Sequence, residues 1–182
     1  MSITNYMSWE GGVDLVGLHG AAETPNIIVH VARMVHTPVG SAPAGIILIQ
    51  PDPTAPPTLM GFVSSDLNVA GYFGPKIFAG TPFENAPVLE ADITISINDQ
   101  GASSKITIGD TIIESSLSNL GATELITREP SPHSPVTQQV LEAIAGSSSV
   151  TVNGEALELT IPEVGTSGGP GAVYAPAGLY AR

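Results

Sequence analysis

The stretch DITISIN, residues 92–98, decides the fold class. Its isoleucines alternate with polar residues, so in an extended chain they share one face and the polar residues share the other. Turn-forming residues follow at 99–101, and Ile106 and Ile108 then resume the same alternation. The pattern predicts an antiparallel hairpin with one face buried and the other in water.

A second hairpin is predicted around Asn153-Gly154, because this dipeptide tolerates the two positive φ angles of a type I′ turn. Elsewhere, short β-branched runs alternate with Gly, Pro, Asn and Asp, which is typical of all-β proteins. We therefore expect an all-β, mainly antiparallel sandwich or barrel that forms one domain, residues 1–182. The other predicted strands are Val13–His19, Asn26–His36, Gly45–Gln50, Thr58–Ser64, Ile77–Ala79, Thr111–Ser116, Thr123–Arg128 and Ala172–Ala175.

One short α-helix is expected near residues 135–145. Ser134 suits the N-cap, and Pro135 suits the first helical position, where its missing N–H does no harm. Gly146 suits the end of the helix. Apolar residues recur every four positions between these signals, at Val136, Val140 and Ile144.

The charge balance excludes one function class. Acidic residues outnumber basic ones by 17 to 5 in the 182 residues, which gives a formal net charge of −12. Nucleic-acid binding needs clustered Lys and Arg, so no nucleic-acid partner is expected. The chain holds no cysteine, which excludes disulfides, thiolate metal sites and thiol nucleophiles. Charged residues make up only 12% of the chain, which implies a surface with few charges. A surface of this kind is compatible with packing between subunits, so we expect a homo-oligomer.

The sequence also bears on localisation. Residues 1–10 contain no basic residue and no apolar run, so they do not match a secretory signal. The apolar run at residues 45–49 is too short to cross a bilayer. We therefore expect a soluble, cytoplasmic protein without a membrane partner.

The segment Gly165-Thr166-Ser167-Gly168-Gly169-Pro170 resembles the GDSGGP nucleophile segment of chymotrypsin-like serine proteases, whose fold is also all-β. The resemblance covers these six residues, and Thr166 stands where that family has aspartate. It implies a nucleophilic Ser167, and His36 and Asp92 precede it in the family's chain order of His, Asp and Ser. The 12 residues after Pro170 are too few for the second barrel of that family. The favoured interpretation is therefore a glycine-rich surface loop.

Both faces of the predicted strand Asn26–His36 are largely apolar, so we expect the strand to be covered on both sides. Arg33 interrupts a row of valines, and it either pairs with a carboxylate, which we favour, or binds an anionic ligand. His30 is a candidate polar group inside a cavity. His30 and His36 would lie roughly 20 Å apart along the strand, too far to share a metal ion. No metal site and no cofactor is expected.

Five of the nine aromatic residues fall between Phe62 and Phe83, in a stretch rich in Gly and Pro. Aromatic rings on such a segment either line a pocket or form a small core under a long loop. Both interpretations stay open. The candidate ligand-binding residues in this segment are Tyr72, Phe73, Lys76, Phe78 and Phe83.

The sequence favours a non-catalytic β-sandwich or barrel that serves in binding or assembly. This function accounts for the low charge, the density of turns and the aromatic segment. Its expected partners are a second copy of the chain and a small apolar or anionic ligand. The alternative is a small enzyme, either a serine hydrolase that uses Ser167 or a cavity-type isomerase or cyclase that uses His30 or Arg33. Whether the chain is an enzyme stays open.

Overall fold

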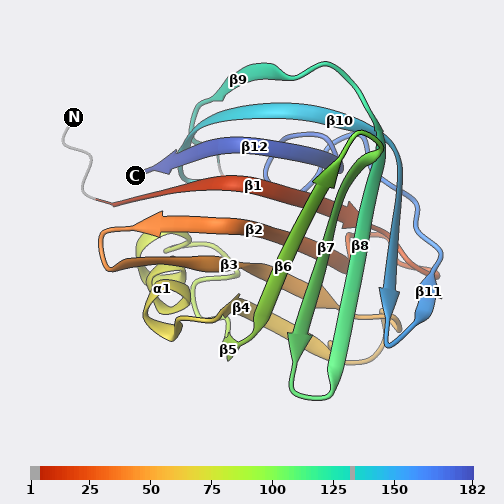
Figure 1. Cartoon of the computed structure of the whole chain (residues 1–182). Coiled ribbons are helices and arrows are strands. Elements are labelled where there is room, and N and C mark those ends of the chain that lie inside the picture. Colours follow the sequence, from red (N-terminus) through yellow and green to blue (C-terminus); the bar gives the residue numbers. More distant parts are fainter. Residues whose placement is uncertain (1–4, 132–133) are drawn as a thin grey trace.

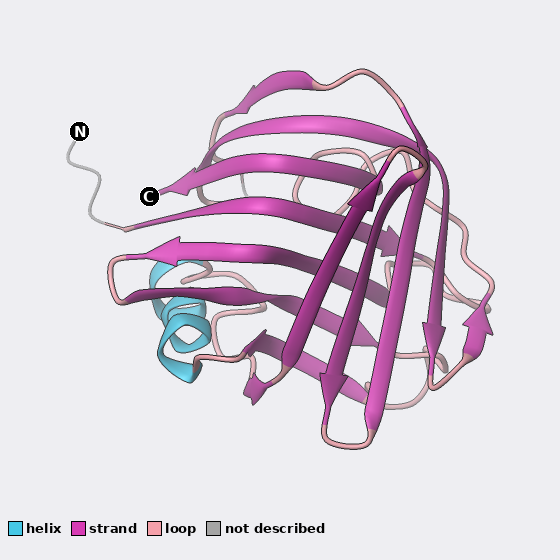
Figure 2. Ribbon diagram, in the orientation of Figure 1, coloured by secondary structure: helices cyan, strands magenta, loops and turns pink. Residues whose placement is uncertain are grey.

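In the computed structural model, which describes residues 5–131 and 134–182, a mostly antiparallel sheet curls into a half-barrel (Figure 1). The prediction of an all-β, mainly antiparallel fold is confirmed, as the predominance of strands in Figure 2 makes plain. The elements are β1 (Tyr6–Gly17), β2 (Ile27–Thr37), β3 (Gly40–Ile49), β4 (Leu59–Ser64), α1 (Leu67–Tyr72), η1 (Phe73–Ile77), β5 (Val88–Glu90), β6 (Asp92–Asn98), β7 (Gly101–Ile108), β8 (Thr111–Leu120), β9 (Glu124–Arg128), β10 (Thr137–Val152), β11 (Glu155–Leu157) and β12 (Ala172–Ala181).

The long strand β10 joins the two halves of the sheet, whose order is β5-β4-β3-β2-β1-β12-β10-β8-β7-β6. Its first part, up to Ile144, pairs with β12, and its second part, from Ala145, pairs with β8. A register shift between Val140 and Ala143 marks the bend. β9 and β11 pair with β10 beside the main path. As a result, β6, β7 and β8 cross over the face of β1–β4 (Figure 1).

Both predicted hairpins are present. β6 pairs with β7 in the expected antiparallel register, from Asp92 opposite Thr107 to Asn98 opposite Gly101. β10 turns into β11 at Asn153 and Gly154, whose φ angles of 50° and 81° are the positive pair that a type I′ turn requires. Local alternation and turn chemistry were therefore sufficient to predict these two hairpins.

The buried apolar residues form two clusters, one on each face of the β1–β4 half. The inner cluster lies between this half and β6–β8, and includes Leu15, Ile47, Ile106 and Leu117. The outer cluster lies on the opposite face with α1 and η1, and includes Trp9, Phe62, Phe73 and Ile77. β2 contributes to both, as expected for a strand that is covered on both sides.

A β-bulge overturns the face assignment at the end of β2. Ile27, Val29 and Val31 lie in the inner cluster, as simple alternation predicts. The same alternation would place Val35 on that face, but it lies in the outer cluster. The register between β2 and β3 shifts between Ala32 and Val35, and this extra residue reverses the alternation.

The helix predicted at residues 135–145 is wrong, because this segment is the first part of β10. Residues four apart share a face in a strand as well as in a helix, so the spacing of Val136, Val140 and Ile144 did not separate the two. Val136 and Val140 are buried in the outer cluster, whereas Ile144 is 56% exposed beyond the bulge. The strand continues through Gly146, where the helix was expected to end.

The helical segment of the structure is instead residues 67–77, which α1 and η1 form together. Asp66 caps it by accepting a hydrogen bond from the Asn68 N–H at 2.9 Å. Pro75 has no N–H, and the segment around it widens into a π-turn that the Phe78 N–H closes on the Phe73 carbonyl. The strand predicted at Ile77–Ala79 is therefore wrong. No helix within the described ranges has the length and apolar character needed to cross a bilayer.

We expect the variants Ile144→Thr and Val140→Thr to differ sharply in stability. Ile144→Thr should change the free energy of unfolding by less than about 0.5 kcal/mol, because the side chain is exposed and Thr suits a strand. Val140→Thr should cost about 1–3 kcal/mol, because it buries a hydroxyl among apolar groups. Urea unfolding measures both changes. Equal losses for the two variants would support a helical stripe and contradict the strand.

Candidate ligand-binding cleft

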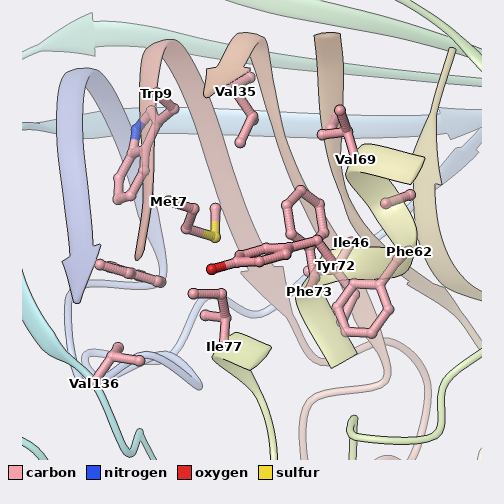
Figure 3. Packing of buried hydrophobic residues seen from close by; sticks show 14 of the residues in the cluster. Met7, Trp9, Val35, Ile46, Phe62, Val69, Tyr72, Phe73, Ile77 and Val136 are labelled. Atoms are coloured by element: carbon pink, nitrogen blue, oxygen red, sulfur yellow. The ribbon is translucent and has the colours of Figure 1, made fainter. Parts of the chain in front are cut away.

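The aromatic segment supplies both core and cleft. Figure 3 shows Phe62, Tyr72 and Phe73 packed together in the outer cluster, and all three are buried. The Phe62 ring lies edge-on to Phe73, with 5.6 Å between ring centroids. Phe78 and Phe83 are only partly buried against this cluster. These two rings therefore remain able to form the wall of a pocket.

A cleft opens on the outer-cluster side, between the loop after η1 and the loop before β12. Its inner part, the deep cavity, measures about 60 Å³, and its outer part, the groove, about 530 Å³. Pro82, Phe83 and Thr166 line both parts, so the two adjoin each other. The deep cavity is lined by Ile28, His30, Ile46, Phe78, Thr81, Pro82, Phe83, Ser134, Thr166, Ser167 and Tyr180. The groove is lined by Pro25, Pro82, Phe83, Ser131, Val164, Gly165, Thr166 and Gly168.

His30 and Asp14 form a polar pair at one wall of the deep cavity. They lie directly opposite each other in the register of β1 and β2, and His30 Nδ1 is 3.6 Å from Asp14 Oδ1. That oxygen is buried and has no hydrogen-bond partner among the described residues. Burial raises the pKa of Asp14 above its usual range, and the nearby His30 offsets part of the rise. The cleft thus presents an imidazole that is backed by a buried carboxyl group.

The loop that contains Ser167 is held down on the sheet. Gln138 is buried, and its Nε2 donates to Ser134 Oγ at 2.7 Å and to the Ser167 carbonyl at 2.9 Å. Tyr180 also lines the deep cavity beside Ser167, and burial raises the pKa of this phenol far above its usual range. Tyr180 therefore stays neutral, and the buried Gln138 holds the main chain of Ser167 in place.

The glycines of this loop allow it to pack closely over an ion pair. Arg128 donates to both carboxylate oxygens of Glu142, at 2.6 and 2.8 Å. A Cβ on Gly169 would lie only 2.9 Å from Arg128 Nη2. The glycine-rich segment that resembles a protease motif therefore has a packing reason: it covers charged residues at the end of the sheet.

The structure brings four of the predicted site residues into the cleft: His30, Phe78, Phe83 and Ser167. Tyr72 and Phe73 belong to the core, and the Tyr72 hydroxyl accepts a hydrogen bond from the Tyr6 N–H. Lys76 is exposed on η1 and does not line the cleft.

The residues that the protease resemblance implied beside Ser167 lie elsewhere. His36 hydrogen-bonds with Glu10 and Ser41, and Arg33 pairs with the same Glu10 at 3.2 Å. Asp92 begins β6 and is exposed. His30, rather than His36, shares the deep cavity with Ser167.

Sequence reasoning missed Asp14 and Tyr180. Asp14 did carry a signal, because it is the one carboxylate within the apolar run from Val13 to Val16. Tyr180 carried none, since its position beside Ser167 depends on the pairing of β12 with β10.

The remaining histidines do not join the cleft within the described ranges. His19 Nδ1 hydrogen-bonds with the Glu158 carbonyl at an exposed site, and His133 lies outside the described residues. Across residues 5–131 and 134–182, no three side chains of His, Asp and Glu lie close enough together to hold a metal ion. Comparison of the chain with protein-family models, with curated proteins and with solved structures gives no match.

Proposed function

We propose that this chain is a non-catalytic binding protein whose cleft takes a small, largely apolar ligand with one polar end. The observation that carries the proposal is the composition of the deep cavity, where apolar walls surround a few converging polar groups, His30, Ser167 and Tyr180. Ligand sites are typically built in this way. At about 60 Å³ the deep cavity accommodates a head group only, so the body of the ligand lies in the groove along Pro82 and Phe83.

Titration with small aromatic and aliphatic fragments, followed by ¹H–¹⁵N NMR, tests this function. We expect the amides of His30, Phe83 and Thr166 to shift together in one saturable process. Phe83→Ala should weaken binding about fivefold, because part of an aromatic wall is removed. Leu125→Ala is the matched control, since Leu125 is 69% exposed on β9 and outside the cleft. Shifts scattered over the surface, or none at the cleft, would contradict the proposal.

Ester hydrolysis is a second candidate function, which the shared cavity of Ser167 and His30 favours. In that reaction Ser167 Oγ would attack the ester carbonyl while His30 takes the proton of the serine hydroxyl. His30 would then give this proton to the leaving alcohol, and water would hydrolyse the acyl-enzyme to release the acid. Asp14 would orient His30. Against this function, the Ser167 carbonyl accepts a hydrogen bond from the buried Gln138 at 2.9 Å, which favours a structural role for this loop.

Labelling with a fluorophosphonate probe separates the two functions. We expect no covalent labelling of the wild-type protein at Ser167, and no difference between wild type and Ser167→Ala. Stoichiometric labelling that is absent from Ser167→Ala and from His30→Gln would instead establish the hydrolase. Ser131→Ala serves as the control, because Ser131 lines the groove but not the deep cavity.

A further inference from the structure

We propose that the polar end of the ligand is a hydroxyl group that donates a hydrogen bond to Nε2 of His30. This inference rests on the proposed function, that the cleft binds a small ligand, and adds the chemical class of the ligand. It comes from the orientation of the imidazole and from the groups that surround it.

The orientation of the His30 ring follows from the strand register. Nδ1 faces Asp14 on β1, at 3.6 Å from Oδ1, which leaves Nε2 as the ring nitrogen for a ligand in the deep cavity that His30 lines. Asp14 Oδ1 has no hydrogen-bond partner among the described residues, and His30 Nδ1 is the ring nitrogen that lies near it. A carboxylate at this position favours the tautomer with its proton on Nδ1. Nε2 then carries a lone pair and acts as an acceptor.

The rest of the cavity wall suits a hydroxyl better than an amine. Ser134 and Thr166 line the deep cavity, and a hydroxyl group can donate as well as accept; the Ser134 hydroxyl accepts from Gln138 Nε2 and has a proton to donate. A ligand hydroxyl both donates and accepts, so it can bind Nε2 and one of these groups together. An ammonium group offers only donors, and it would have to lose its hydration in a cavity with apolar walls.

The apolar part of the ligand is set by the residues between the deep cavity and the solvent. Ile28, Ile46 and Phe78 form apolar walls inside, while Phe83 and Val164 continue them into the groove. The inferred ligand class is therefore an alcohol with an apolar, aromatic or branched body.

The ring tautomer is measured directly with long-range ¹H–¹⁵N spectra of the His30 side chain at pH 8. We expect the form protonated on Nδ1 in the wild-type protein. Asp14→Asn should shift the population toward the form protonated on Nε2, because the carboxylate is gone. His36→Gln is the control and should leave the His30 spectrum unchanged. A wild-type ring protonated on Nε2 would overturn the inference.

Three fragments with one body then test the ligand class by NMR titration: benzyl alcohol, benzyl methyl ether and benzylamine. We expect the alcohol to bind wild type about fivefold more tightly than the ether, as one hydrogen bond to a neutral acceptor implies. In His30→Leu the alcohol and the ether should bind equally. Benzylamine should bind more weakly than the alcohol.

The outcomes separate the two proposals. If the ether or the amine binds at the cleft as tightly as the alcohol, the inference about the hydroxyl is wrong and the binding function stands. If no fragment shifts the amides of His30, Phe83 and Thr166, the binding function fails and the inference fails with it.

Discussion

Gly45→Ala should lower the free energy of unfolding by about 3 kcal/mol, near the upper end of what overpacking costs. A Cβ on Gly45 would lie 2.0 Å from the His30 carbonyl oxygen and 2.6 Å from the Val31 Cα. Both are backbone atoms of β2, so no side-chain rotation relieves the contact. Since Gly45 pairs with Val31, the methyl group would force β2 and β3 apart in the middle of the sheet.

The measurement is the melting temperature, which should fall by about 6–12 °C for a chain of this length. Gly71→Ala is the matched control, because nothing lies within 4 Å of a Cβ at Gly71 and the residue is inside α1. There the added methyl should stabilise the helix, by up to about 1 kcal/mol. Equal melting temperatures for Gly45→Ala and wild type would show that the backbones of β2 and β3 move apart at Gly45 without a loss of stability. That result would contradict the prediction.

The sequence predicted the structure correctly where the structure depends on residues that are close together along the chain. The hairpin of β6 and β7 follows from alternation, and the turn at Asn153-Gly154 follows from the φ angles that these residues tolerate. The error at residues 135–145 arose because a four-residue spacing is common to helices and strands. The true helix at 67–77 was missed because Gly71, Gly74 and Pro75 disfavour helices.

Gly74 shows why such residues are nevertheless found in that helix. A Cβ on Gly74 would lie 2.3 Å from the Glu84 carbonyl oxygen, so only glycine lets the following loop pack against η1. This contact joins residues whose proximity depends on the tertiary fold. Helix propensities, which depend only on the residue types along the chain, cannot predict this contact.

The cleft could be predicted only in pieces for the same reason. The sequence identified four residues of the cleft one by one: His30, Phe78, Phe83 and Ser167. That they share one cavity depends on how the loop before β12 and the loop after η1 pack against the sheet. The partner of His30 was harder still, since Asp14 becomes its neighbour through the register of β1 and β2. A one-residue change of register would place Asp14 on the other face.

Asp14→Asn should stabilise the protein at pH 8, by about 1.4 kcal/mol for each unit by which folding raises the pKa of Asp14. Burial raises the pKa of Asp14, a rise that His30 and Arg128 oppose and Glu142 reinforces. The folded protein therefore holds this proton more tightly than the unfolded chain. As the pH rises above about 4, the unfolded chain releases the proton first, and wild-type stability falls until the folded-state pKa is passed. Asparagine keeps the shape of the side chain and removes this cost.

The quantity to measure is the difference in unfolding free energy between Asp14→Asn and wild type, from urea titrations between pH 3 and pH 8. The difference should be near zero at pH 3 and should grow toward pH 8. Asp52→Asn is a control of opposite sign, because hydrogen bonds from Thr54 lower the pKa of the exposed Asp52. That variant should lose a little stability at pH 8 and none at low pH. If Asp14→Asn is instead less stable than wild type at pH 8, the attraction of the ionised Asp14 to His30 and Arg128 outweighs the desolvation cost of burying its charge. In that case the same two residues also hold in place the carboxylate that orients His30.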